Sequence, residues 1–495
     1  MKIPEYDSLD ATAMADLVRR GELTAAELLD AAIERIAARN PAINAVVSTF
    51  YDRARQRLAD LPSDGPMYGV PFLVKDLKMQ IAGTVTTNAT RLLANRKAEQ
   101  TSLLAQRYED AGLVIVGKTN SPELGIMGVT EPALWGPCRN PWDTNHTSGG
   151  SSGGAAAAVA ARIVPVAHGG DGGGSIRIPA SACGMFGLKP TRGRVSMAPF
   201  RGEAWSGLVQ EHVVARTVRD SALFLDIAAQ PTPGEPYYAP AHAGSWRAHV
   251  DQPPGALTVA YTKKALLAGE SDRDCVAAVE DAAALMESLG HTIEEVDLPF
   301  SRDEMAEAYF VTVASNIARF VEETAETAGK KPRSRDFEEA TWLLAQIGWN
   351  TPAPRLLKVQ HAIHQTTRAM AAFFAKYDVA MTSTMALPPV KVGTFDLSFT
   401  ERAQLRLLRN APLGVLLDAA LQNLGSNALA ATPNTQLFNM TGQPAMSVPL
   451  HWSPSGLPIG IQFAADAGRE DLLLRLARQL EQARPWDNKR PPLVK

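Results

Sequence analysis

Apolar and polar positions alternate at helical spacing in the first sixty residues. Between residues 28 and 36 the apolar side chains fall three or four positions apart, which predicts an amphipathic helix. Thr24 and Glu27 form a capping box just before it. Asn40 and Pro41 follow, and a proline disfavours continuation of a helix, so we expect the helix to stop there.

Further along, helical patterns and short apolar runs follow one another. Residues 102–111 are predicted to form a helix, and after a glycine the apolar run at 113–116 is predicted to form a buried strand. Residues 272–289 and 291–296 repeat this order around a second glycine. A chain in which helices and strands alternate in this way is typical of an α/β fold.

The length of the chain leaves its domain organisation open. At roughly 150 residues per domain, 495 residues suggest about three domains, although one large α/β sheet can hold as many residues. Residues 230–255 are rich in proline and predict a long surface connection. We find no internal repeat and no block of like charges.

Composition and charge narrow the class of protein. With 45% hydrophobic and 20% charged residues, the chain can bury a large core, which excludes a disordered or fibrous protein. A net charge of -3 gives no electrostatic reason to expect nucleic acid or an anionic membrane as partner, so a small neutral ligand fits better. A homodimer is compatible with the sequence.

Cysteine usage and the absence of long apolar runs predict a cytoplasmic protein. Three scattered cysteines give neither a disulfide framework nor a metal-binding pair. The first residues lack the apolar core of a signal peptide, and the longest apolar run, 155–161, is too short to span a membrane.

A glycine–serine stretch at residues 148–154 leads into a small-residue helix predicted at 155–161. A flexible linker does not run directly into such a helix, so the stretch is interpreted as part of a built site. It also matches the G-x-S-x-G pattern of α/β-hydrolases, with Ser151 or Ser152 as nucleophile. That motif requires a preceding strand, and residues 140–147 are polar and turn-forming, which disfavours this alternative.

A second glycine loop, residues 169–174, ends at Ser175. Consecutive glycines leave backbone N–H groups unshielded, as in an oxyanion hole. A phosphate-binding loop is the alternative, but it calls for a neighbouring lysine and a following helix, and we do not expect residues 176–179 to begin one because they include Pro179.

Lys75 stands at the end of the apolar run 70–74. Taken alone, it is as consistent with a snorkelling lysine at a sheet edge as with a functional group. If it is buried beside hydroxyl groups, desolvation lowers the pKa of the amine and makes a base available near neutral pH.

Three further patterns are interpreted as structural. Residues 112–119 match the P-loop pattern GxxxxGK[ST], but their apolar middle predicts a strand rather than a phosphate-binding loop. His361 and His364 share a helical face without a third ligand nearby, so no metal site is expected. His168, in an apolar context, suits a strand residue as well as a catalytic base and is assigned no role.

Lys75 in GVPFLVKD, Ser151 in GGSSGG and Ser175 in DGGGSIRIPA occur together in one order and spacing. In these three motifs, their order and their spacing, the chain resembles the amidase signature family. The resemblance continues through GKTNSPELG, FNMTGQPAMSVPL and GLPIGIQ, and so covers nearly the whole sequence.

The resemblance implies one compact α/β/α domain around a large mixed sheet, and no cofactor or metal. The expected parts are a helical segment at residues 1–60, a signature core at 69–195, the connection at 230–255 and the remaining sheet and pocket region at 256–495. It further implies a Ser-cisSer-Lys triad in which Ser175 attacks, Ser151 relays the proton across a cis peptide bond and Lys75 accepts it. The implied oxyanion hole consists of the amides of Gly172, Gly173, Gly174 and Ser175, supported by Ser152, Asp171 and Arg177.

Gly172 departs from the family pattern, since many members carry a larger apolar residue at that position. Because the position contributes only a backbone N–H, we expect a looser loop with retained activity.

The sequence is compatible with several classes of substrate. Stretches such as NPAINAVV, TEPALWGPCRNPW and GREDLLL are similar to bacterial cyclic-amide-dimer hydrolases of nylon-oligomer breakdown. Cyclic or linear amides, aryl acylamides, carbamates (urethanes) and esters are all compatible. Met127 and Trp135, together with Phe200 and Trp205, are candidates for an apolar substrate pocket.

Two other functions are alternatives to this interpretation. One is the amidase subunit of a glutamine-dependent tRNA amidotransferase, which would require partner chains. The other is a binding protein on an inactive amidase scaffold, which the presence of Lys75, Ser151 and Ser175 disfavours.

Overall fold

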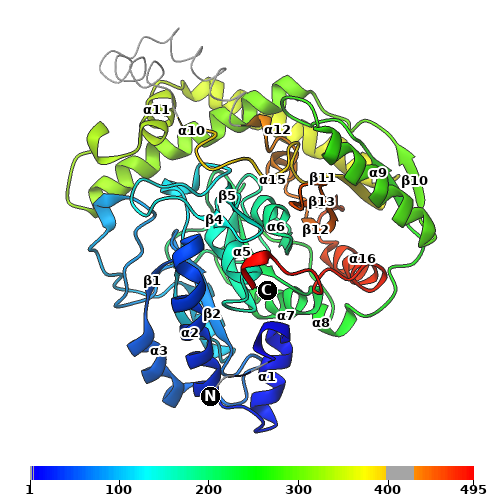
Figure 1. The fold of residues 1–495 in the computed structure, drawn as a ribbon. Helices are drawn as coiled ribbons and strands as arrows, with labels where there is room; N and C mark the ends of the chain where they lie inside the picture. Colours follow the sequence, from blue (N-terminus) through cyan, green and yellow to red (C-terminus); the bar gives the residue numbers. More distant parts are fainter. Residues whose placement is uncertain (1–2, 4, 397–428, 495) are drawn as a thin grey trace.

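A mixed β-sheet of eleven strands runs through the computed structural model, which describes residue 3, residues 5–396 and residues 429–494 (Figure 1). Parallel and antiparallel pairs both occur in it. In spatial order the strands are β1 (Val46–Thr49), β3 (Val114–Thr119), β2 (Pro71–Lys75), β6 (Val166–Asp171), β8 (Gln210–Ala215), β7 (Phe186–Lys189), β12 (Ala445–Trp452), β13 (Pro458–Ala464), β11 (Val379–Ser383), β9 (Thr258–Tyr261) and β10 (Thr292–Glu295).

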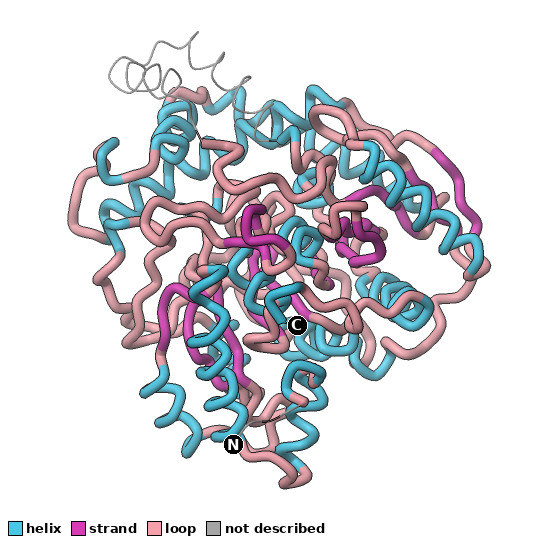
Figure 2. Tube along the Cα trace, in the orientation of Figure 1, coloured by secondary structure: helices cyan, strands magenta, loops and turns pink. Residues whose placement is uncertain are grey.

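Helices surround this sheet (Figure 2). They are α1 (Ala11–Arg19), α2 (Ala25–Ile43), α3 (Tyr51–Arg57), α4 (Leu103–Asp110), α5 (Gly153–Ala160), α6 (Arg177–Cys183), α7 (Val218–Ala228), α8 (Trp246–His249), α9 (Arg273–Ser288), α10 (Arg302–Thr327), α11 (Glu339–Trp349), α12 (Ala353–Phe374), α15 (Gln436–Thr441) and α16 (Glu470–Ala483). A separate hairpin consists of β4 (Arg139–Asn140) and β5 (Asp143–Thr147).

The side chains of β2 show how the sheet separates two apolar layers. Phe72 and Val74 pack into the cluster that contains α1, α4, α7, α9 and α16, whereas Leu73 packs into the cluster around α5. Successive strand residues point to opposite faces, so both faces of the sheet are covered by helices. The expected α/β/α arrangement around a large mixed sheet is confirmed.

The last two strands of the chain join the two parts of the sheet. β12 pairs with β7 on one side and with β13 on the other, and β13 pairs with β11. Strands from the first 220 residues and strands from after residue 255 therefore belong to one sheet. The predicted connection at residues 230–255 is irregular apart from α8 and is largely exposed.

Most predicted elements are present, but the end of α2 was predicted wrongly. The capping box of Thr24 and Glu27 is formed. Pro41, however, lies inside the helix, which ends two residues later where Asn44 adopts a left-handed conformation (φ 51°). A proline lacks the N–H group for one helical hydrogen bond. Near the end of a helix this loss is tolerated, so α2 continues past Pro41 to Ile43.

The glycine–serine stretch also differs from the prediction. α5 begins at Gly153 rather than at Ala155. The strand β5 precedes the stretch, although none was predicted there. Its residues are polar because β5 pairs with β4 instead of entering the large sheet. All of α5 is buried. A Cβ on Gly154 would lie 2.3 Å from the Asn120 backbone nitrogen, so glycine is required for the helix to sit this deep.

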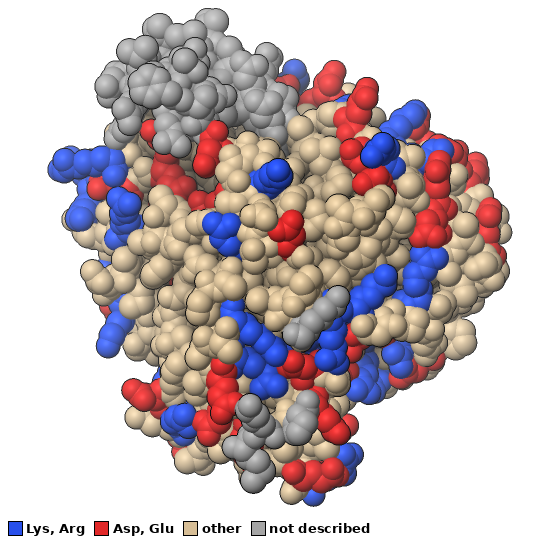
Figure 3. All heavy atoms as spheres, in the orientation of Figure 1, with Lys and Arg blue, Asp and Glu red and all other residues tan. Residues whose placement is uncertain are grey.

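The prediction that residues 112–119 form no phosphate loop agrees with the structure, because residues 114–119 are the buried strand β3. The helix–strand units predicted at 102–116 and 272–296 correspond to α4 with β3 and to α9 with β10. None of the helices in the described residues has the length and apolar character to cross a bilayer. Figure 3 shows basic and acidic side chains interspersed on one face rather than gathered into a field of one sign.

Candidate active site

The candidate site forms where two neighbouring parallel strands end. Lys75 is the last residue of β2, and Asp171 is the last residue of β6. The strands pair in parallel through Leu73 and Ala167. Their carboxyl ends therefore lie at the same edge of the sheet, where α/β proteins commonly bind ligands.

Lys75 is buried, with 1% of its surface exposed, on a strand that has neighbours on both sides. The alternative of a snorkelling edge lysine is therefore wrong. Its Nζ lies 2.7 Å from Ser151 Oγ and 3.3 Å from the carbonyl oxygen of Gly170. Burial lowers the pKa of the Lys75 amine to about 8, although the carboxylates of Glu211 and Asp171 act in the opposite direction.

Ser151 lies in the turn between β5 and α5, next to the second glycine loop. The peptide bond between Gly150 and Ser151 is cis, as the family resemblance implies. The Ser152 N–H donates to the carbonyl oxygen of Ser175 at 3.2 Å, and Ser152 Oγ accepts from the Gly170 N–H at 3.3 Å. These contacts hold the segments of Ser151 and Ser175 side by side.

Asp171 organises the loop that leads to Ser175. Its carboxylate accepts backbone N–H groups from Gly174 at 2.7 Å, Ile176 at 3.2 Å and Arg177 at 3.4 Å. α6 begins directly afterwards, so the expectation that no helix begins at residues 176–179 was wrong. Pro179 is the third residue of α6, in the first turn, where a missing N–H costs no helical hydrogen bond.

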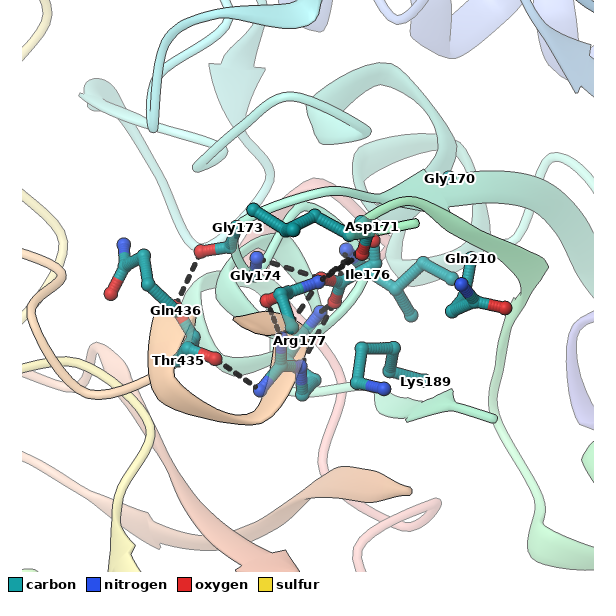
Figure 4. A network of polar contacts seen from close by, with 12 residues as sticks. Gly170, Asp171, Gly173, Gly174, Ile176, Arg177, Lys189, Gln210, Thr435 and Gln436 are labelled. Atoms are coloured by element: carbon teal, nitrogen blue, oxygen red, sulfur yellow. Dashed lines mark hydrogen bonds and ion pairs between the residues drawn. The ribbon is translucent and has the colours of Figure 1, made fainter. Parts of the chain in front are cut away.

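Arg177 forms a buried ion pair with Asp171 and connects it to the C-terminal part of the chain (Figure 4). Its guanidinium donates to Gln462 Oε1 at 2.7 Å, to the Thr435 carbonyl oxygen at 2.9 Å and to Asn439 Oδ1 at 2.6 Å. The Asn439 amide in turn donates to both the carbonyl and the carboxylate of Asp171. All donors of the guanidinium therefore face fixed acceptors.

Burial alone would raise the pKa of Asp171. The Arg177 guanidinium, together with the hydrogen bonds from Arg177 and Asn439, outweighs burial and holds this pKa well below its usual range. The carboxylate is therefore ionised near neutral pH.

The sequence reasoning did not single out Thr435, Asn439 or Gln462, which support Arg177. Asn439 and Gln462 lie within FNMTGQPAMSVPL and GLPIGIQ, two stretches that carry the family resemblance. That signal could have identified them as candidates, although nothing in the sequence pairs them with Arg177. Thr435 lies outside these motifs, and its Oγ1 donates to the Gly173 carbonyl oxygen at 2.6 Å.

The expectation of a looser loop at Gly172 was wrong. A Cβ at this position would lie 2.8 Å from the ring of Trp205 and 3.0 Å from a methyl group of Val209. Trp205 thus fills the space that a larger residue would take, and the loop is buried and packed. A Cβ at Gly173 would lie 2.0 Å from the hydroxyl of Tyr309, so this phenol covers the loop from α10.

The candidate pocket residues lie in different places. Met127 borders Gly150 and lines a cavity of about 650 Å³, whereas Trp135 donates its Nε1–H to Asp76 Oδ2 at 3.3 Å. Phe200 lines a different cavity, of about 440 Å³, whose lining does not include Lys75, Ser151 or Ser175. Trp205 packs against Gly172 of the second glycine loop.

The histidines occupy structural positions. His168 accepts the Lys75 backbone N–H at Nδ1, over 3.4 Å, and its Nε2 lies 3.0 Å from Glu211. His361 and His364 are exposed on α12. Within the described residues, no group of three or more metal-ligating side chains is brought together.

Fold and site thus define an α/β enzyme in which a buried lysine of lowered pKa faces a serine hydroxyl beside a glycine-rich loop. The comparisons with known proteins agree with this class. The family model described as Amidase matches residues 27–474. A 6-aminohexanoate-cyclic-dimer hydrolase from Pseudomonas sp. (strain NK87) is 38% identical over 506 aligned residues, covering 98% of this chain and 97% of that protein.

Two solved structures show the same likeness. A 6-aminohexanoate cyclic dimer hydrolase complexed with substrate superimposes with a TM-score of 0.91 at 34% identity, covering 100% of both chains. A bacterial aryl acylamidase of the amidase signature family gives a TM-score of 0.85 at 26% identity, covering 97% of both chains. The chain belongs to the Amidase family. It is an amidase, an enzyme that acts on carbon–nitrogen bonds other than peptide bonds.

Proposed function

We propose that this amidase hydrolyses a small apolar amide through an acyl-enzyme on Ser175. Ser151 relays the proton and Lys75 acts as the base. The observation that carries the proposal is the 2.7 Å contact between Lys75 Nζ and Ser151 Oγ in a buried setting that favours the neutral amine. The Ser152–Ser175 backbone hydrogen bond supports the placement of the nucleophile beside this pair.

The proposed reaction has two halves. Ser175 Oγ attacks the amide carbon while its proton passes to Ser151, whose own proton passes to Lys75. The carbon–nitrogen bond then breaks, and the proton held by Lys75 returns through Ser151 to the leaving amine. Water repeats the sequence on the ester of Ser175, which releases the carboxylic acid and restores the serine.

In this mechanism the negative oxygen of the tetrahedral intermediate is stabilised by backbone amides of residues 172–175. The Gly174 N–H already donates to Asp171 Oδ1, so the largest share of this role falls to Gly172, Gly173 and Ser175. Asp171 then acts indirectly, because its hydrogen bonds to the loop fix where the amides point.

An apolar amide is proposed as substrate because Trp205, Val209 and Tyr309 cover the loop before Ser175. The names of the related proteins, a hydrolase of a cyclic amide dimer and an aryl acylamidase, support the same class. Cyclic and linear amides, aryl acylamides, carbamates and esters are therefore the compounds to compare.

The test is a panel of these five compound classes, assayed with the wild-type chain and with Ser175→Ala. Loss of all hydrolysis in the variant, with labelling of the wild type at Ser175 by a fluorophosphonate, is the expected result. Ser288→Ala is the matched control, because its Oγ lies on exposed helix surface and donates only to Leu285. Turnover that persists in Ser175→Ala would end the proposed mechanism.

A further inference from the structure

A second cavity, of about 440 Å³, lies close to the triad but is not lined by it. Lys78 and Leu124 line it, and their chain neighbours Leu77 and Gly125 lie beside Ser151: a Cβ on Gly125 would meet Leu77 at 2.6 Å and Ser151 Oγ at 3.4 Å. The cavity opens to solvent at a mouth formed by the exposed residues Arg96, Lys97, Glu99, Gln100 and Phe200. It is accessible and large enough for a small organic molecule.

Lys78 is the inner basic residue of this cavity. Its backbone takes a left-handed conformation (φ 60°) and donates its N–H to Asn88 Oδ1 at 2.8 Å. Its Nζ lies 3.2 Å from the centre of the Phe320 ring. Within the described part of the chain, this Nζ has neither a hydrogen bond nor a carboxylate partner.

The carboxylates that line the cavity each lie beside another basic group. Glu323 pairs with Arg201, and Glu211 lies 3.0 Å from His168 Nε2. At the mouth, Glu99 lies 3.9 Å from Arg96. Lys78 is therefore left facing a cavity with an ammonium group for which the surrounding residues supply no close counter-ion.

Apolar side chains form one part of the remaining wall, and polar side chains form the rest. The apolar part includes Met79, Leu93, Leu104, Leu124, Met197 and Phe200, which come from five separate segments. A ligand that fits this combination has one negative group for Lys78 and a hydrocarbon part for the apolar wall. We propose that this cavity binds a medium-chain monocarboxylate, with the carboxylate at Lys78 and the chain directed toward Phe200.

Binding at this position is linked to protonation of Lys78. Burial, then the neighbouring positive charge of Arg201, lowers the pKa of Lys78 well below its ordinary value, and Arg319 adds to this. Glu211 and Glu323 act in the opposite direction but do not compensate. A bound carboxylate supplies the missing counter-ion, so the complex takes up a proton and its affinity falls as pH rises.

Calorimetric titration with octanoate tests the proposal, and it does not depend on any catalytic activity. We expect wild-type protein to bind octanoate more tightly at pH 6 than at pH 9. Lys78→Met should weaken binding about tenfold or more, the factor expected when a charge-assisted hydrogen bond is lost. Lys264→Met, which removes a lysine that is 73% exposed and does not line this cavity, should leave the affinity nearly unchanged.

A conservative variant keeps the test decisive if Lys78→Met does not fold. Lys78→Arg retains a positive charge at all accessible pH values, so octanoate binding should persist and lose its pH dependence. Equal affinity for octanoate in wild type and Lys78→Met would overturn the proposal. So would a pH dependence in Lys78→Arg equal to that of the wild type, or octylammonium or inorganic phosphate binding as tightly as octanoate.

Discussion

At the scale of single residues, the protonation of Lys75 sets the pH range of the proposed chemistry. The amine can accept a proton only when it is neutral, and its pKa is about 8. We therefore expect kcat/KM to fall about tenfold for each pH unit below that value. A pH–rate profile on any substrate that the panel identifies measures this, and a flat profile from pH 6 to 9 would contradict the role of Lys75.

Substitution of Glu211 tests the direction in which the pKa of Lys75 responds to a neighbouring charge. The Glu211 carboxylate is the group that most strongly favours the charged form of Lys75. Glu211→Gln should therefore move the acidic limb of the profile to lower pH, because the neutral amine becomes easier to form. A shift to higher pH would show that another group controls the limb.

Burial of the Lys75 amine lowers the free energy of unfolding, and this effect can be measured. The pKa of the amine falls from 10.5 to about 8 on folding, so between these values the unfolded chain binds more protons and stability rises with pH. Below pH 8 the penalty is complete, at roughly 3 kcal/mol for a pKa difference of this size. We expect Lys75→Met to raise the free energy of unfolding at pH 7 by about 2 kcal/mol, allowing for the lost hydrogen bond to Ser151.

Lys75→Met could stabilise the protein by removing the buried amine or by packing better than lysine. Chemical denaturation at pH 7 and pH 10.5 distinguishes these two causes. The gain in Lys75→Met should be largest at pH 7 and become small by pH 10.5, where Lys75 is neutral in the folded protein and about half protonated in the unfolded chain. Lys264→Met is the control, because the side chain of Lys264 is 73% exposed and the change should be small at both pH values. An equal gain at both pH values would argue for packing.

At the scale of elements, the loop between β6 and α6 depends on one ion pair. Asp171→Asn removes the charge that balances the fully buried Arg177 guanidinium, so we expect a loss of about 3–5 kcal/mol in unfolding free energy. Asp297→Asn breaks the exposed contact with Lys264 and should cost less than about 1 kcal/mol. Denaturant titration of both variants measures the difference, and similar small losses would show that the loop holds without Asp171.

The packing of the same loop against Trp205 gives a second expectation at this scale. Gly172→Ala should lower stability by about 1–3 kcal/mol, since its Cβ would lie 2.8 Å from the indole ring. Trp205→Leu in the same chain should recover part of that loss. The coupling energy of the double-mutant cycle measures the contact, and strict additivity would mean that the two positions do not meet.

At the scale of the whole molecule, one sheet should hold both parts of the chain together even when the backbone is cut. Tyr238 is 76% exposed within the connection at 230–255, so chymotrypsin should cleave there. Because β12 pairs with β7, residues 1–238 and 239–495 should still elute together from a sizing column. Fragments that separate without denaturant would indicate two domains.

The sequence predicted the fold class, which the structure confirms, and the triad stays a prediction; both rest on local signals. Lys75, Ser151 and Ser175 each stand in a short motif, and helix–strand alternation is visible within about twenty residues. The contacts of Arg177 with Asn439 and Gln462 span more than 260 positions, and no pattern in one sequence reveals such pairs. The continuation of α2 past Pro41 was missed because a proline is tolerated near a helix end, and β5 was missed because its polar residues pair in a short hairpin outside the large sheet.

The place of β12 and β13 also bears on how the protein is made. This hairpin lies in the interior of the sheet, yet it is synthesised after every other described strand. While a ribosome is still translating residue 440, β7 and β11 each lack the neighbour they have in the finished sheet. The native core can close only near the end of synthesis, so the nascent chain carries open strand edges for most of its time on the ribosome.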